Sequence, residues 1–325
     1  MAWASGAAGT VLRTEDSGYA WQSCAMPPGA EKLDFRSVWG WDAKTAIVMS
    51  SGPGAQSRIY RTTDGCAHWT LVATNKHPEG FWDALVFSNA KNGYLLGDPV
   101  KGSFFLLRTE DGGLHWRSVV SKGLSTGGQK LGVFAASNQA MVLFGPVMGN
   151  VSVPVFGTSG AAGGKSPYIY SGGIDCGMEM AHRNPEGCLT RYWDFQKTGV
   201  PMAGASDSQG IFALGVHGST PGDLQMVAVG GDYTQPGKTT GTAAWRDATT
   251  DTWTAATKPP HGYRSSVAWD AADHAWIAVG PNGSDVSYDD GKTWSTLGND
   301  GYNALSLPWV VGPDGHIAKV KGLKK

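Results

Sequence analysis

One turn pattern recurs along this chain and constrains its fold more than any other feature. The pattern is Ser/Thr-x-Asp-x-Gly-x-x-Trp, and its copies begin at Thr14, Thr62, Thr109 and Ser287. In the second copy Cys66 stands where the other copies have glycine. The aspartate can accept hydrogen bonds from N–H groups of its own turn, and glycine supplies a positive φ. Because apolar residues precede each copy, the pattern predicts a β-hairpin with a tryptophan after its turn.

This turn already uses the acceptors of its aspartate, which favours a structural role over catalysis. We assign that role to Asp16, Trp21, Asp64, Trp69, Asp111, Trp116, Asp289 and Trp294. The pattern resembles the Asp-box, or bacterial neuraminidase repeat, of sialidase-like β-propellers. The first three tryptophans are 48 and 47 residues apart, and a four-stranded propeller blade needs a period of roughly 40–50 residues.

Two further repeated signatures give the expected strands. Apolar stretches that end in glycine mark second strands at 2–6, 46–52, 94–97, 226–230, 276–280 and 309–312, with either 153–157 or 141–145 in the fourth blade. First strands are expected at 33–38, 80–85, 131–135, 210–214, 262–267 and 301–305. The sequence therefore predicts an all-β, seven-bladed β-propeller of four-stranded antiparallel blades, with the first blade incomplete. Six blades is the alternative count.

The chain has 325 residues, a length that suits one propeller domain over 1–325. Residues 146–190 are rich in Gly, Ser and Pro, and we expect a loop insertion there, in the fourth blade. Cys176 and Cys188 lie in this segment, where a disulfide is expected in an oxidising compartment and free buried thiols are the alternative. No signal peptide precedes the first strand, so we expect that one was removed or truncated from a periplasmic or secreted protein.

Composition excludes several function classes. The formal net charge is −1 with dispersed Lys and Arg, which argues against a nucleic-acid partner. No apolar run approaches the roughly 20 residues of a membrane span. The four cysteines form no CxxC pair, and the eight histidines show no HxH or HExxH spacing, so no metal site is expected. The glycine runs do not lead into a helix, and we expect no cofactor.

Candidate binding residues come from the repeat itself. In a propeller the first strand of each blade lines the central channel, and residues near its start face the channel mouth. The repeats place there Asp34, Arg36, Trp82, Asp83, Tyr263, Arg264, Tyr302 and Asn303, and a loop after a second strand adds Tyr233. A cup of polar and aromatic side chains suits a glycan or a peptide. The alternative is that Arg and Asp from neighbouring blades pair with each other and lock the ring.

Glycoside hydrolysis needs two carboxyl groups about 5–10 Å apart across a pocket. Asp83, Asp98 and Asp232 are the catalytic candidates, but their separation in space cannot be read from the sequence. Sialidases with the resembling fold carry an Arg-Ile-Pro motif. Here Arg36 is followed by Ser37 and Val38, so the match to a sialidase is poor.

A longer resemblance covers nearly the whole chain. The segments 57–65, 97–100, 230–233, 262–265 and 279–285 look like those of exported bacterial proteins similar to the photosystem II assembly factor, often labelled glycosyl-hydrolase-like. That resemblance implies a non-enzymatic propeller that acts as a binding or assembly scaffold for a protein or glycan at the channel mouth. We also expect the chain to be a monomer. The alternative function is a glycoside hydrolase that uses the channel-mouth carboxylates.

Overall fold

The structure is a computed structural model that describes residues 1–148, 151–161, 166–175, 192–218 and 223–323. Contacts between residues divide the chain into two compact units, Met1–Val120 and Ser121–Lys325. Each unit is described by itself below. The expectation of one domain over the whole chain therefore stays a prediction.

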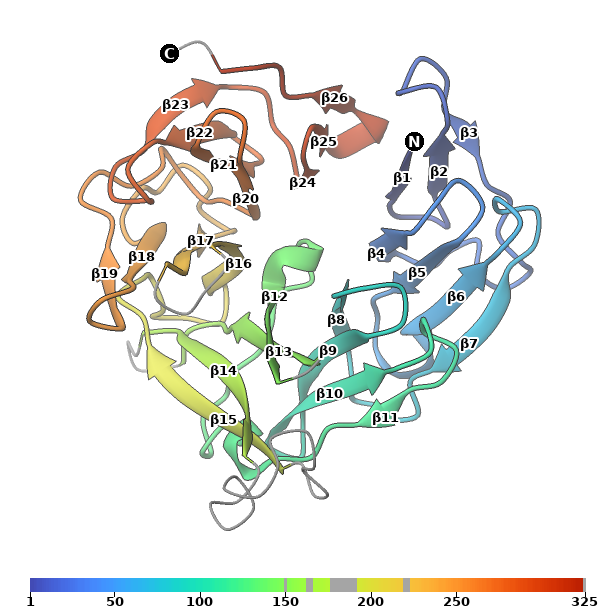
Figure 1. The fold of residues 1–325 in the computed structure, drawn as a ribbon, viewed down its shortest axis with the longest axis horizontal. Helices are drawn as coiled ribbons and strands as arrows, with labels where there is room; N and C mark the ends of the chain where they lie inside the picture. The colour runs from blue at the N-terminus through green and yellow to red at the C-terminus, as the bar shows by residue number, and fades with distance from the viewer. Residues whose placement is uncertain (149–150, 162–165, 176–191, 219–222, 324–325) are drawn as a thin grey trace. The chain divides into compact units, whose positions relative to one another are not determined.

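The first unit contains three antiparallel sheets (Figure 1). Its three-stranded sheet consists of β1 (Ala2–Ser5), β2 (Val11–Thr14) and β3 (Gln22–Ser23). The second sheet consists of β4 (Phe35–Gly40), β5 (Ala46–Ser50), β6 (Arg58–Thr62) and β7 (Thr70–Thr74). The third consists of β8 (Trp82–Phe87), β9 (Gly93–Val100), β10 (Ser103–Thr109) and β11 (Arg117–Ser118).

The second unit contains four antiparallel sheets. The first is β12 (Met141–Met148), β13 (Val151–Gly157), β14 (Tyr168–Asp175) and β15 (Tyr192–Gly199). The second is β16 (Gln209–His217), β17 (Gln225–Asp232), β18 (Ala243–Asp247) and β19 (Thr252–Ala255). The third is β20 (Ser266–Asp270), β21 (Ala275–Gly280), β22 (Gly283–Ser287) and β23 (Ser295–Gly298). The last is β24 (Ala304–Ser306), β25 (Trp309–Val311) and β26 (Ile317–Lys319).

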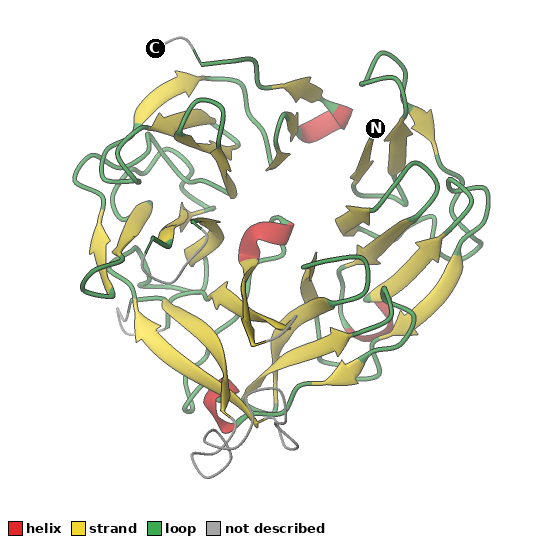
Figure 2. Cartoon of the chain, viewed as in Figure 1, coloured by secondary structure: helices red, strands yellow, loops and turns green. Residues whose placement is uncertain are grey.

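These seven sheets confirm the all-β, seven-bladed β-propeller and rule out the count of six. Strands within each sheet follow in chain order, so every blade is a meander. The first blade has three strands, as the sequence predicts. Figure 2 shows that the described helices are short; they are the single 3₁₀ turns Gly54–Gln56, Lys122–Leu124, Asn138–Ala140 and Pro313–Gly315.

The core lies between neighbouring sheets of each unit. All five residues of β5 and all six of β21 are buried, so these strands read as continuous apolar runs rather than alternating ones. In the first unit Ile47 and Met49 of β5 pack with Trp82 and Leu85 of β8. Burying each such side chain contributes about 1.5–3 kcal/mol. The sheets are therefore held face to face by large apolar side chains.

The fourth blade differs from the sequence-based prediction. Leu131–Ala135 is not a strand, and β12 is the first strand of that sheet. The segment instead lies against the end of β13, where Ser159 N donates to Gly132 O at 2.8 Å. Its residues are alternately buried and half-buried, so the segment shows a strand-like period of two although it is not a strand. Of the two alternatives for the second strand, 153–157 is correct.

The expected loop insertion at 146–190 is also corrected in part. Strands β13 and β14 lie within that range and belong to the fourth blade. Gly, Ser and Pro in this segment do not prevent pairing, because Pro154 lies opposite Leu143 and the glycines at 172 and 173 pair within β14 and β15. Cys176 and Cys188 lie outside the described residues.

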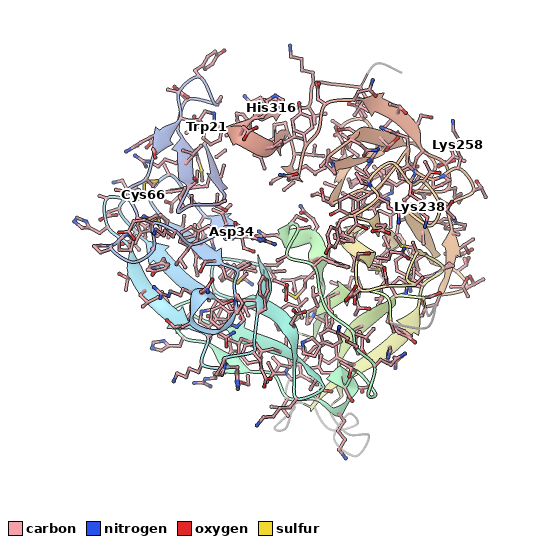
Figure 3. All side chains as sticks on the ribbon, turned by 180° about the vertical axis from the view of Figure 1, so that it is seen from behind. Trp21, Asp34, Cys66, Lys238, Lys258 and His316 are labelled. Carbon is pink, nitrogen blue, oxygen red and sulfur yellow. A yellow bond between two sulfur atoms is a disulfide. The ribbon has the colours of Figure 1, made fainter. Side chains whose placement is uncertain are left out.

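A disulfide that the sequence analysis did not predict joins Cys24 to Cys66, with their Cα atoms 5.6 Å apart. It connects the segment after β3 to the turn between β6 and β7, where Figure 3 labels Cys66. Cys66 adopts a φ of 66°, in the region that favours glycine. The one copy of the turn that lacks its glycine is thus the copy that is cross-linked.

Candidate functional site

The four repeated turns share one set of hydrogen bonds. The Ser or Thr hydroxyl donates to the aspartate Oδ1 over 2.8–2.9 Å in every copy. The hydroxyl oxygen accepts from the N–H of Gly18, Cys66, Gly113 or Gly291. The aspartate Oδ1 accepts from the N–H of Ala20, His68, His115 or Thr293. These contacts support the structural role assigned to the aspartates, which stays a prediction.

Two of these aspartates also contact a histidine. The N–H of His68, together with its ring, lowers the pKa of Asp64 to about 2. Burial raises the pKa of Asp111, but the N–H and ring of His115 outweigh it and hold the pKa at about 2. Both ring contacts measure 2.7 Å between Nδ1 and Oδ2. Carboxyl groups that are already ionised at neutral pH cannot act as general acids there.

A β-bulge near the start of the first strand sets the direction of several candidate residues. On β4 Phe35 pairs with Ser50 and Ser37 with Met49, which leaves Arg36 as the extra residue. The extra residue is Asp83 on β8 and Phe212 on β16. A bulge re-aims a side chain out of the regular pleat. Arg36, Asp83 and Phe212 therefore occupy equivalent positions in their own sheets, and Phe212 was not among the predicted residues.

Arg264 occupies a different position from the one the repeat alignment implied. Its N–H donates to Gly230 O at 3.0 Å, as Phe35 N donates to Gly6 O and Ile211 N to Thr158 O. Arg264 is thus equivalent to the buried Phe35 and Ile211 and not to Arg36. This offset of one residue explains why an arginine is 0% exposed.

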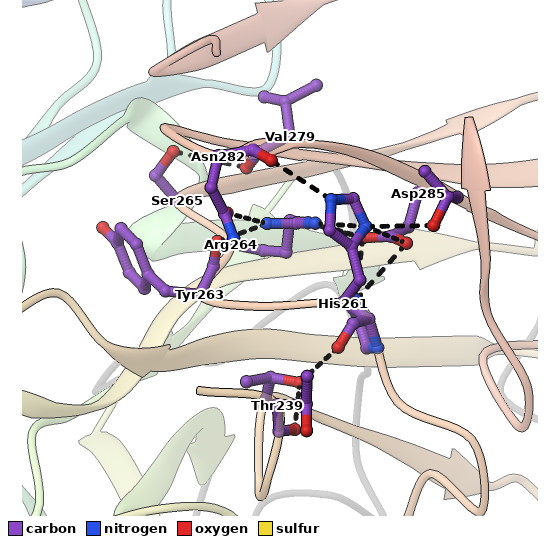
Figure 4. A network of polar contacts seen from close by, with 11 residues as sticks. Thr239, His261, Tyr263, Arg264, Ser265, Val279, Asn282 and Asp285 are labelled. Carbon is purple, nitrogen blue, oxygen red and sulfur yellow. Dashed lines mark hydrogen bonds and ion pairs between the residues drawn. The ribbon is translucent and has the colours of Figure 1, made fainter. Parts of the chain in front are cut away.

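A complete set of partners surrounds the buried guanidinium of Arg264 (Figure 4). Its Nε donates to Asp285 Oδ2 at 2.7 Å, and its Nη1 donates to Tyr263 O and to Asn282 Oδ1. His261 Nδ1 lies 2.9 Å from Nη2 and 2.8 Å from Asp285 Oδ1. Burial lowers the pKa of Arg264, and Asp285 opposes that effect. Arg264 and Asp285 therefore pair as the alternative expected of Arg and Asp, but within one blade and not between neighbouring blades.

In the first unit, carboxyl groups gather around Arg36. Arg36 Nε donates to Asp34 Oδ2 at 2.7 Å, and both side chains are partly exposed. Asp83 is 2% exposed, and its Oδ2 has no hydrogen-bond partner among the described residues. Burial raises the pKa of Asp83 well above its usual value, the charge of Asp98 adds to this, and Arg36 opposes it. Two of the three catalytic candidates, Asp83 and Asp98, are thus electrostatic neighbours.

The third catalytic candidate, Asp232, lies in the second unit and is saturated with donors. Gln209 Nε2 donates to its Oδ2 at 3.0 Å, and Thr234 donates to its Oδ1 through N and Oγ1. Burial raises the pKa of Asp232, but these hydrogen bonds, led by that of the Thr234 hydroxyl, lower it overall. The carboxylate fixes the turn after β17, which does not suit a general acid.

Beside Asp232, four aromatic side chains form a cluster in the second unit. Phe134 stacks on Phe212 with ring centroids 3.6 Å apart, and Tyr263 meets Phe212 edge-on at 4.6 Å. Tyr233 contacts both phenylalanines edge-on and is 53% exposed. Burial raises the pKa of the Tyr263 hydroxyl, so it stays neutral. Sequence reasoning found the two tyrosines and missed Phe134 and Phe212, which are far apart in the sequence and stack only in the fold.

The remaining candidates are divided between surface and core. Tyr302 stacks on His316 with centroids 5.1 Å apart, and Asn303 is exposed. Trp82 is buried in the core of the first unit and stacks on Phe105. Among the residues that the structure describes, no three His, Cys, Asp or Glu side chains are grouped to hold a metal. No helix in the described ranges is long and apolar enough to cross a membrane.

In sequence, the chain matches no protein-family model and no curated protein. In structure, it is similar to "YCF48 bound to D1 peptide" (14% identity, 97% of this chain and 86% of the other, TM-score 0.57). It is similar to YCF48 from Cyanidioschyzon merolae (18% identity, 97% and 89%, TM-score 0.55). It also resembles a GH74 enzyme from Niastella koreensis (14% identity, 91% and 43%, TM-score 0.57). The chain thus has the β-propeller fold of YCF48-like proteins, and this likeness is one of fold.

Proposed function

We propose that this chain is a non-enzymatic binding or assembly scaffold for a protein partner. The observation that carries the proposal is a contrast in the second unit. Arg264 and Asp232 have their hydrogen-bonding groups engaged within their own blade, whereas Tyr233 stands more than half exposed on a rigid ring cluster. Rigid aromatic side chains provide much of the binding energy at protein interfaces, with little entropy to lose. One structure of this fold has a bound peptide, so the fold is compatible with that role.

The test uses paired tyrosine variants and cross-linking with mass spectrometry. The folded full chain is cross-linked in extracts of its own organism, and the partners of wild type, Tyr233→Ala and Tyr288→Ala are compared. Tyr288 is 48% exposed and lies in a repeated turn, which makes it a matched control. We expect a partner that wild type and Tyr288→Ala retain and Tyr233→Ala loses. Equal retention by the wild type and both variants would contradict the proposed surface, and an absence of partners would contradict the function.

A glycoside hydrolase is the second candidate, because one observation favours it. Asp83 has a raised pKa beside the charge of Asp98, and an acid with a raised pKa next to a second carboxylate is what glycoside hydrolysis uses. The near-complete burial of Asp83 weighs against direct contact with a sugar. Hydrolysis of a panel of fluorogenic glycosides by wild type, with loss in Asp83→Asn and Asp98→Asn, would establish this function. If the partner is a glycan and is not cleaved, the Tyr233 cluster is where we propose that it binds.

We also propose that the chain is a monomer and acts in the periplasm or outside the cell. The Cys24–Cys66 disulfide supports the location, because such bonds persist in oxidising compartments. The repeated turns fit the Asp-box pattern of exported propellers. We would test the location by thiol labelling of chain made in an oxidising compartment and of chain made in a reducing one. Sedimentation would test the oligomeric state. Stable, folded chain with free Cys24 and Cys66 thiols in its native compartment would contradict the location.

A further inference from the structure

A groove of about 690 Å³ lies in the first unit, between its second and third sheets. One wall is β7 with the three residues that follow it. The opposite wall comes from β10 and from the turn that contains Leu114 and Trp116. Leu71 is 50% exposed on the first wall and Leu114 is 48% exposed on the second. The volume falls in the range of sites that hold a ligand of several hundred daltons.

The groove follows the edge of β7. Every residue from 71 to 77 lines it, and successive residues of a strand point to opposite faces. A groove that touches all of them therefore runs along the edge of the strand. β7 is the last strand of its sheet and pairs with β6 on one side, so among the described residues no strand covers its other side.

The sequence of β7 lacks most of the devices that protect an edge. Thr70–Thr74 contains no charged residue and no proline, which are the features that commonly block edge pairing. A bulge leaves Val72 without a partner on β6, and this half-buried side chain lines the groove. The unpaired backbone favours a polypeptide as the occupant over a glycan or a lipid, because only a polypeptide can continue the ladder of hydrogen bonds.

The side chains of the groove indicate which peptide fits. His77 meets Phe105 edge-on at 5.4 Å, and Phe105 stacks on Trp82, so one side is aromatic. The indole N–H of Trp82 has no hydrogen-bond partner among the described residues. Lys76 is exposed and lines the groove with its cationic side chain. None of the described lining residues is acidic. Apolar and acidic side chains therefore complement this groove.

We propose that β7 accepts an extended segment of a partner protein as a fifth strand of its sheet. The segment places bulky apolar side chains in the groove and a carboxylate beside Lys76. This inference deepens the proposed function and rests on it, since the partner of the scaffold would supply the segment. It adds a second contact surface, in the first unit, to the aromatic cluster of the second unit.

The test titrates the full chain with an octapeptide that alternates glutamate with leucine and phenylalanine. Because Trp82 and Trp116 line the groove, binding is read from tryptophan fluorescence and by isothermal titration calorimetry. We expect saturable binding, weakened by about tenfold when alternate peptide nitrogens are methylated, since methylation removes the ladder donors. A peptide with lysine in place of each glutamate should bind even more weakly than the methylated peptide. Equal binding of the methylated peptide, or no binding of the acidic one, would overturn the proposal.

Two variants locate the site. Leu71→Glu places a charge on the edge and should weaken the acidic peptide by about tenfold or more. Val120→Glu changes a side chain that is 84% exposed and outside the groove, and it should leave binding unchanged. Both variants should keep the wild-type melting temperature. An unchanged affinity in Leu71→Glu would refute the edge site. If a partner still depends on Tyr233 while the peptide does not bind, this inference fails and the proposed function stands.

Discussion

The side chains of Arg264 and Asp285 form a buried ion pair within one blade, with Nε and Oδ2 2.7 Å apart and exposures of 0% and 1%. Arg264 lies just before β20 and Asp285 on β22, so the pair joins the first and third strands of one sheet. Its remaining donors reach Tyr263 O and Asn282. A residue that the sequence marked as a binding arginine thus holds its own blade together.

We expect Asp285→Ala to destabilise the chain by about 3–5 kcal/mol, because it leaves the buried guanidinium without its counter-charge. The double variant Arg264→Met, Asp285→Ala should recover part of that loss, since both charges are then absent. Denaturant unfolding of the wild type and the variants measures both effects. A loss below about 1 kcal/mol in Asp285→Ala would show that Asn282 and His261 satisfy the arginine without it.

Removal of the Cys24–Cys66 disulfide tests how the first two sheets are held. Cys24→Ser should lower the free energy of unfolding by about 2–4 kcal/mol, because the bond closes a loop with a sequence separation of 42. In that background Cys66→Gly should regain about 1 kcal/mol over Cys66→Ser, since residue 66 has a positive φ. Thermal and denaturant melts provide the values. Equal stability of the glycine and serine variants would mean that the left-handed backbone carries no cost here.

The hydroxyl of Thr109 is the key acceptor of its turn. It accepts from Gly113 N at 3.0 Å and donates to Asp111 Oδ1 at 2.9 Å, and Thr109 is buried. Thr109→Val keeps the shape but leaves the buried N–H unsatisfied, so we expect a loss of about 1–3 kcal/mol. Thr109→Ser retains the hydroxyl and should lose less. A loss in Thr109→Val no larger than that in Thr109→Ser would show that the hydrogen bonds of the hydroxyl do not stabilise the turn.

Asp83 should give the stability of the chain a distinctive pH dependence. Its pKa is raised in the folded state, first by burial, so the folded chain holds this proton more tightly than the unfolded chain. Stability from this group is complete below the unfolded pKa, near 4, and is lost as pH rises through the folded pKa. Asp83→Asn does not titrate. The melting temperature of wild type relative to Asp83→Asn should therefore fall as pH rises from about 4 toward 8.

Asp98→Asn is the control for that experiment. It removes a charge that raises the pKa of Asp83, so the fall in relative melting temperature should be smaller and should occur at lower pH. If the melting temperatures of wild type and Asp83→Asn change in parallel over this pH range, Asp83 has an ordinary pKa. In that case the main support for the glycoside hydrolase alternative is also lost.

The sequence by itself determined the blades. The turn pattern uses only contacts within a few residues, such as Thr14 to Asp16 and Gly18, and local chemistry can be read from local sequence. The glycine-ended apolar runs gave the second strands for the same reason. The prediction of a strand at Leu131–Ala135 was wrong, because alternating burial looks the same whether or not a neighbouring strand pairs with the segment.

Only the tertiary structure decided which candidates share a site. Phe134 and Phe212 are 78 residues apart and stack because two different blades bring them together. Cys24 and Cys66 are joined for a similar reason. Arg36 and Asp83 are the extra residues of bulges, and Arg264 is not, because strand register differs by one residue. A shift of one residue in register moves a side chain to the other face of its sheet. Register and contacts between blades follow from packing over long sequence distances, and no local pattern encodes them.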